Sequence, residues 1–87
     1  MNLYNSSIVK AIEPNGNVAY YGSLADCRKE YGIRYDALLV KLIEQGGLAP
    51  DGKTFFDWPT DYELEEIAQN KITLITTGRR EQQENEN

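Results

Sequence analysis

Histidine is absent from this chain of 87 residues, and cysteine occurs only once, at Cys27. Without histidine, the chain lacks the commonest general base and the commonest metal ligand of proteins. A single cysteine excludes an internal disulfide and any zinc site built from several cysteines. We therefore expect no enzyme activity, no metal site and no cofactor, and we interpret Cys27 as a buried, unreactive thiol.

Long apolar runs are also missing. No stretch approaches the roughly 18 apolar residues that a membrane helix needs. Residues 1–7 have neither the positive start nor the apolar run of a signal peptide. Small domains without disulfides are typical of reducing compartments. The sequence thus predicts a cytoplasmic protein that does not enter the membrane.

Basic charge is scarce overall, with a formal net charge of -5 that is unevenly distributed. Residues 1–59 carry six basic and seven acidic side chains, whereas the segment beyond Pro59 carries three basic and seven acidic ones. Nucleic-acid binding depends on cations that displace counterions from phosphates. This distribution argues against strong nonspecific binding to DNA, but a nearly neutral body leaves specific binding open.

The first half of the chain predicts a β-hairpin followed by two helices. Residues 8–13 and 18–21 are rich in β-branched or aromatic residues, and Asn15-Gly16 between them favours a tight turn. Ser23 is a good N-cap for a helix over 24–31, and Gly32 suits its C-terminal end. A second helix over 35–45 has the apolar stripe Leu38, Leu39, Leu42 and Ile43. Together the two helices predict a helix-turn-helix-like corner.

The second half predicts smaller elements within the same domain, which we place at residues 1–77. Residues 48–58 contain a Pro-Asp-Gly turn typical of a second short hairpin. Thr60 or Asp61 is a candidate cap for a helix over 61–69, and residues 71–76 alternate like a strand. Residues 78–87 contain no apolar side chain, which predicts a disordered tail. The fold class is therefore α+β.

Residues 8–57 resemble the nuclease-associated modular DNA-binding domains, also called intron-encoded nuclease repeats, which accompany phage and intron-encoded homing endonucleases. These modules consist of a hairpin with a glycine turn, an aromatic residue, a serine, a short helix, a glycine followed by an aliphatic residue, and a second helix that ends in glycine. The residues that carry the resemblance are Ile12, Asn15-Gly16, Tyr21, Ser23-Leu24, Cys27, Tyr31-Gly32-Ile33, Leu38, Ile43, Gly46 and Gly52-Lys53-Thr54-Phe55.

The resemblance implies a small phage-type accessory protein whose second helix enters the major groove of DNA while the first helix braces it. Arg34 would then read guanine or contact phosphate, Lys41 would contact phosphate, and Gln45 would pair with adenine. Tyr35 lies on the same exposed side. Arg28 and Lys29, together with Arg34 and Lys41, could form a basic stripe that contacts phosphates. Acidic residues are interleaved with these cations, so an ordinary solvated surface is the alternative interpretation. Such proteins often dimerise, so a homodimer stays open.

The segment 55–66 supports the alternative of a protein-interaction module, for example an inhibitor of a host enzyme. Alternation in the strand 54–58 places Phe56 and Trp58 on one face and Phe55 and Asp57 on the other. An exposed aromatic face would be a partner surface. The residues assigned to that surface are Phe56, Trp58, Asp57 and Asp61.

Overall fold

The fold is built on the hairpin formed by strands β1 (Val9–Ile12) and β2 (Val18–Tyr21). The computed structural model describes residues 8–76. At the turn, Gly16 adopts a positive φ of 93°, and the Asn15 side chain accepts a hydrogen bond of 2.9 Å from the Asn17 backbone N–H. A positive φ costs glycine little because it has no Cβ. The predicted hairpin is confirmed.

Two further strands complete a sheet in the order β3-β1-β2-β4. Strand β3 (Phe55–Asp57) pairs antiparallel with β1, and the short β4 (Leu74–Ile75) pairs parallel with β2. The predicted second hairpin is present as an antiparallel bridge between Leu48 and Phe55. The predicted C-terminal strand is present, although shorter than residues 71–76. The predicted tail from Gly78 onward lies outside the described residues.

Helices α1 (Leu24–Tyr31) and α2 (Asp36–Glu44) form the predicted corner. The Ser23 hydroxyl accepts a hydrogen bond of 3.1 Å from the Asp26 backbone N–H, which caps the start of α1. Gly32 ends the helix in the left-handed conformation, at φ 70°. Both caps were expected from the sequence, because serine satisfies free N–H groups and glycine tolerates positive φ.

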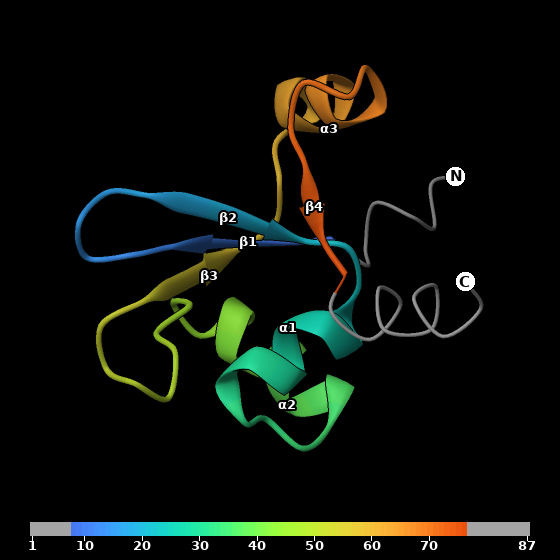
Figure 1. Cartoon of the computed structure of the whole chain (residues 1–87). Coiled ribbons are helices and arrows are strands. Elements are labelled where there is room, and N and C mark those ends of the chain that lie inside the picture. Colours follow the sequence, from blue (N-terminus) through green and yellow to red (C-terminus); the bar gives the residue numbers. More distant parts are fainter. Residues whose placement is uncertain (1–7, 77–87) are drawn as a thin grey trace, which may run out of the picture.

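The hydrophobic core lies between the sheet and this helix pair, which occupies one face of the sheet (Figure 1). Val9, Cys27 and Leu39 are completely buried in it. The Tyr31 ring contacts Tyr21 and Phe56 edge-on, with ring centroids 6.1 and 5.0 Å apart. Edge-to-face packing is the favourable arrangement for aromatic rings. Several of the aromatic side chains are therefore committed to the core.

One part of the expected apolar stripe of α2 does not face the core. Leu39 and Ile43 are buried, but Leu38 is 42% exposed. Leu42 lies one turn beyond Leu38 in the same row and is partly buried against the core, so only the first turn of this row projects into solvent. The prediction that Leu38 packs in the core is wrong.

Helix α3 (Asp61–Ala68) lies on the opposite side of the sheet from α1 and α2 (Figure 1). Thr60 caps it, and Glu63 completes a capping box by accepting a hydrogen bond of 2.8 Å from the Thr60 backbone N–H. The structure thus decides between the two predicted caps in favour of Thr60. None of the residues of α3 is buried, so this helix contributes little to the core.

Candidate nucleic-acid interface on the second helix

Helix α2 presents a stripe of side chains to solvent. Leu38, Lys41 and Gln45 are exposed and follow one another at spacings of three and four residues, which places them on the same side of the helix. At a rise of 1.5 Å per residue they span about 10 Å, the length of roughly three base pairs of DNA. Arg34 and Tyr35 lie immediately before the helix and are also exposed, Tyr35 by 63%.

Arg34 and Lys41 take part in neither of the ion pairs found among residues 8–76, and nor does the exposed Lys29. Within the described chain, their charges are thus available to a ligand. Residues 22–56, which include both helices, carry five basic and five acidic side chains. This side of the molecule is therefore electrically balanced, and cations and anions alternate on it.

Arg28 has a different position from the other predicted DNA contacts. Its Nε donates to Asp36 Oδ1 at 2.6 Å, and its Nη1 donates to the carbonyl oxygen of Arg34 at 2.9 Å. The guanidinium thereby joins the last turns of α1 to the first turn of α2. Arg28 is consequently occupied within the protein, where it holds the corner, and its predicted contact with DNA stays a prediction.

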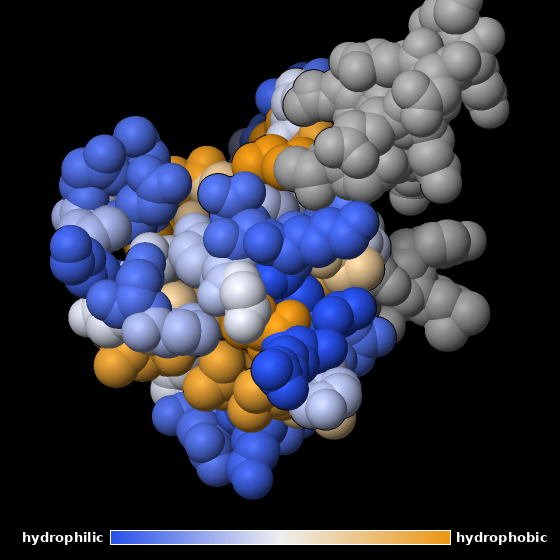
Figure 2. All heavy atoms as spheres, turned by 60° about the horizontal axis from the view of Figure 1, so that its bottom comes forward, coloured by the Kyte–Doolittle hydropathy of each residue, from blue (hydrophilic) through white to orange (hydrophobic). Residues whose placement is uncertain are grey.

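The side of the molecule on which α1 and α2 lie also carries apolar surface. Figure 2 shows an orange patch on this side, bordered by hydrophilic residues. Leu38 is the large apolar residue of α2 whose exposure exceeds a third. An exposed leucine beside cations could contact the methyl group of thymine on the edge of a base. The same combination would also suit a partner protein with a mixed apolar and charged surface.

Comparison with protein families, curated proteins and solved structures found no match for this chain. The resemblance in residues 8–57 therefore stays a prediction.

The predicted aromatic partner surface needs a correction, because Phe56 is only 3% exposed. Its ring contacts Tyr31 in the core, and Trp58 is half-buried against the same core. Alternation along the strand correctly separates the two faces, but it cannot tell which of them the helices cover. The exposed aromatic residue of β3 is Phe55, at 48%, and Asp57 shares its face.

Sequence reasoning missed the polar cluster centred on Glu63. The carboxylate accepts hydrogen bonds from Lys10 Nζ at 3.0 Å and from the Tyr20 hydroxyl at 2.6 Å, in addition to the bond from Thr60. Lys10 and Tyr20 come from β1 and β2, so the cluster ties α3 to the sheet. The spacing of Thr60 and Glu63 is the sequence signal for the capping box alone.

The cluster shifts two titrations in opposite directions. Burial of Glu63 opposes ionisation, but the hydrogen bonds from Tyr20, Thr60 and Lys10, together with the charge of Lys10, lower its pKa to about 2. Burial, the hydrogen bond to Glu63 and the charges of Glu63 and Glu66 raise the pKa of Tyr20 to about 12. Glu63 is therefore an anionic anchor at neutral pH, with Tyr20 as a neutral donor.

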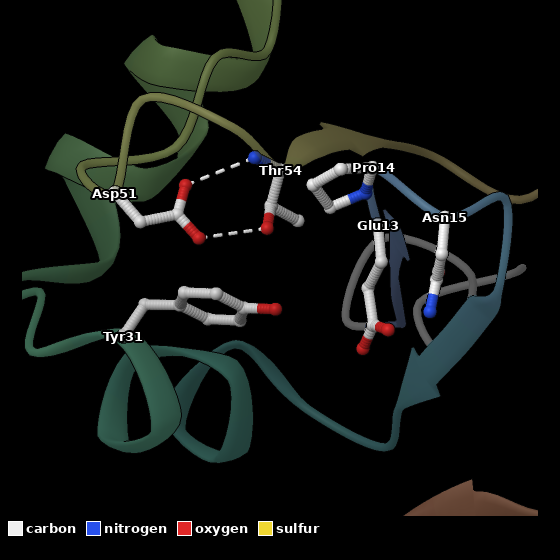
Figure 3. A pocket seen from close by; sticks show the side chains of 6 residues that line it. All are labelled: Glu13, Pro14, Asn15, Tyr31, Asp51 and Thr54. Atoms are coloured by element: carbon white, nitrogen blue, oxygen red, sulfur yellow. Dashed lines mark hydrogen bonds between the residues drawn. The ribbon is translucent and has the colours of Figure 1, made fainter.

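A cavity of about 410 Å³ opens between the hairpin turn and the loop before β3 (Figure 3). The Asp51 carboxylate on its wall accepts hydrogen bonds from the Thr54 hydroxyl and from the backbone N–H groups of Lys53 and Thr54, which lowers its pKa. Its hydrogen-bonding capacity is thus used to close the loop. Glu13 adds a second carboxylate, so the cavity repels phosphate and does not extend the interface on α2.

Cys27 is completely buried, as predicted. Burial, followed by the charge of Glu30, raises the pKa of its thiol to about 12. Because the thiolate is the reactive form, this thiol is unreactive at neutral pH.

Within residues 8–76, no helix has both the length and the apolar character to cross a membrane.

Proposed function

We propose that this protein binds double-stranded DNA by placing α2 in the major groove. The observation that carries the proposal is the exposure of Lys41 on the outward stripe of α2 and of Arg34 just before the helix, neither of which has an acidic partner among the described residues. The resemblance of residues 8–57 to a DNA-binding module gives the same assignment from the sequence. A helix held on the outside of a small domain by a bracing helix is a common way to read DNA.

The contacts follow from the geometry of the stripe. Arg34 is suited to a bidentate contact with guanine or to a phosphate, Gln45 to adenine, and Leu38 to the methyl group of thymine. Lys41 and Lys29 are suited to phosphates, which position the protein without reading sequence. Arg28 supports these contacts indirectly, because it holds the backbone carbonyl of Arg34.

The charge balance decides what kind of binding to expect. Three free cations would displace about three counterions, so the logarithm of affinity should fall with the logarithm of salt concentration with a slope of about -3. Such a slope is shallow for a DNA-binding protein. We therefore propose that base contacts supply much of the affinity and that binding to random sequence is weak.

The test begins with selection of a preferred duplex from a random oligonucleotide pool, followed by fluorescence anisotropy at several salt concentrations. The double substitution Arg34→Ala and Lys41→Ala should weaken binding at least tenfold while the circular dichroism spectrum and thermal melting stay unchanged. Lys71→Ala is the matched control, because Lys71 is an exposed cation outside the helix pair. Failure of the pool to yield an enriched sequence, or equal binding by the double variant, would refute the proposal.

A further inference from the structure

A row of apolar side chains crosses the face of the sheet that α1 and α2 do not cover. The pairing register places Phe55 opposite Ile12, and Ile12 opposite Val18, while the isolated bridge places Leu48 opposite Phe55. Residues that pair directly have side chains on the same face. Leu48, Phe55 and Val18 are 47%, 48% and 44% exposed, and Ile12 is half-buried. We call these four residues the apolar row.

The apolar row is continuous but narrow. Neighbouring strands lie about 4.8 Å apart, so four side chains in register form a stripe about 14 Å long. Helix α3 does not cover it, because its contact through Glu63 reaches Lys10 and Tyr20, which occupy the next row of the same face. A contiguous exposed apolar stripe on a small domain marks an interaction surface more often than isolated apolar residues do.

The charges beside the apolar row indicate what kind of partner fits. Asp57 lies two residues along the strand from Phe55, about 6.6 Å away, and it is exposed. Glu66 is close enough to Tyr20 to raise its pKa through its charge, and Glu63 is already paired with Lys10. Residues 8–21 and 57–76, which form most of this side, carry two basic and six acidic side chains. A second copy of this chain would bring the same negative charges face to face.

We propose that the apolar row is a docking site for an amphipathic helix of a partner protein that carries basic side chains beside its apolar stripe. Residues three and four apart on a helix are about 5–6 Å apart, which matches the strand spacing along the row. Two to three turns of helix would cover its length. Lysine or arginine flanking the stripe would face Asp57 and Glu66, and complementary charge of this kind sets orientation and association rate.

The probe is a 16-residue helical peptide with leucine at every third or fourth position and lysine on both flanks. Its control has the same leucines and glutamate in place of every lysine. Isothermal titration calorimetry with the whole chain should show saturable binding of the lysine peptide and at least tenfold weaker binding of the glutamate peptide. Chemical-shift changes should centre on Ile12, Val18 and Phe55.

Two variants of the protein test the location. Phe55→Thr should weaken peptide binding at least fivefold, because it shortens the apolar row while threonine preserves strand propensity. Leu38→Thr is the matched control, since it removes a similarly exposed side chain from α2 on the other side of the sheet, and it should bind the peptide unchanged. Neither the peptide nor Phe55→Thr should alter DNA binding, so this proposal and the proposed function fail independently.

Three outcomes would overturn the docking proposal. Equal binding of the lysine and glutamate peptides would remove the charge argument, and equal effects of Phe55→Thr and Leu38→Thr would place the site elsewhere. Absence of peptide binding together with self-association that Phe55→Thr abolishes, measured by analytical ultracentrifugation, would assign the row to a second copy of this chain.

Discussion

The two faces of the sheet are covered in different ways. On one face, α1 and α2 bury Cys27, Leu39 and Ile43 in the hydrophobic core. On the other, α3 buries no residue and is attached through the Glu63 carboxylate. Apolar packing depends little on pH or salt, whereas an anchor based on an ion pair depends on both. We therefore expect the packing of α1 and α2 to be insensitive to pH and salt, and the attachment of α3 to weaken at low pH or high salt. We call these the robust side and the sensitive side.

The difference also separates the two proposed surfaces. The helix pair is electrically balanced and presents free cations, whereas the side with α3 is acidic. A DNA duplex on α2 would be held away from the acidic side by the thickness of the sheet. A basic partner on the apolar row would not compete for the same side chains. We infer that the two surfaces can be occupied together.

The largest effect should come from breaking the robust side with Leu39→Ala. Leu39 is completely buried, and removing such a side chain leaves a cavity that costs about 3 kcal/mol. This loss is a large fraction of the roughly 5–10 kcal/mol that stabilises a small domain. Leu38→Ala, at the neighbouring exposed position, should cost less than about 1 kcal/mol. Urea denaturation of both variants measures the contrast, and equal losses would contradict the assigned core.

The second effect should come from removing the anchor with Glu63→Gln. Glutamine retains the capping box but loses the ion pair with Lys10. The pKa of Glu63 falls from 4.5 to about 2 on folding, which corresponds to at most about 3 kcal/mol at neutral pH. Because the folded pKa is the lower one, this contribution is nearly complete above the unfolded value of 4.5 and is lost as pH falls from there through the folded value of about 2.

Urea denaturation at pH 7, 4 and 2.5 tests this sign directly. The wild type should be more stable than the Glu63→Gln variant at pH 7, less so at pH 4, and should keep only about a quarter of that advantage at pH 2.5, just above the folded pKa of about 2. Glu65→Gln is the control, because Glu65 is an exposed acid on the same helix, and it should change stability by less than about 0.5 kcal/mol. A Glu63→Gln difference that stays constant with pH would show that the carboxylate charge does not hold α3.

The elements themselves could be predicted because their signals are local. Asn15-Gly16, Ser23, Gly32 and Thr60 mark turns and caps through interactions within a few residues, and each occupies the expected place. The pairing of β4 with β2 and the contact of Glu63 with Lys10 join residues far apart in the chain. No local pattern encodes such contacts, so the anchor could not be predicted.

The site residues show the same division. Exposure of Lys41 and Gln45 followed from the helical spacing, although Leu38 on the same side was expected in the core. The choice between the two faces of β3 was wrong for Phe56, since alternation fixes which residues share a face but not which face the helices cover.

Gly47 shows a requirement for glycine that comes from tertiary packing. It has φ 86°, and a Cβ there would clash with the backbone carbonyl of Phe56, a contact that only the folded chain reveals.

The smallest effect on stability is expected for Arg28→Ala and Arg34→Ala. Comparing these two variants is also the sharpest test of the helix pair. Arg28 bonds Asp36 and the Arg34 carbonyl across the corner, and a partly exposed pair with one backbone bond contributes about 1 kcal/mol. Arg34→Ala should cost less than about 0.5 kcal/mol, because Arg34 has no acidic partner among the described residues. Thermal melting of the two variants measures this order.

The order should invert when binding to the selected duplex is measured. Arg34→Ala should lower affinity about tenfold, the expected size for one bidentate base contact, whereas Arg28→Ala should lower it only two- to threefold by loosening the corner. The inversion separates a residue that contacts DNA from one that positions it, because a loss of stability alone would affect both measurements in the same order. If Arg28→Ala proved the more damaging in both assays, the intact corner and not a contact of Arg34 with a base would account for the loss of binding, and the proposed role of Arg34 would be contradicted.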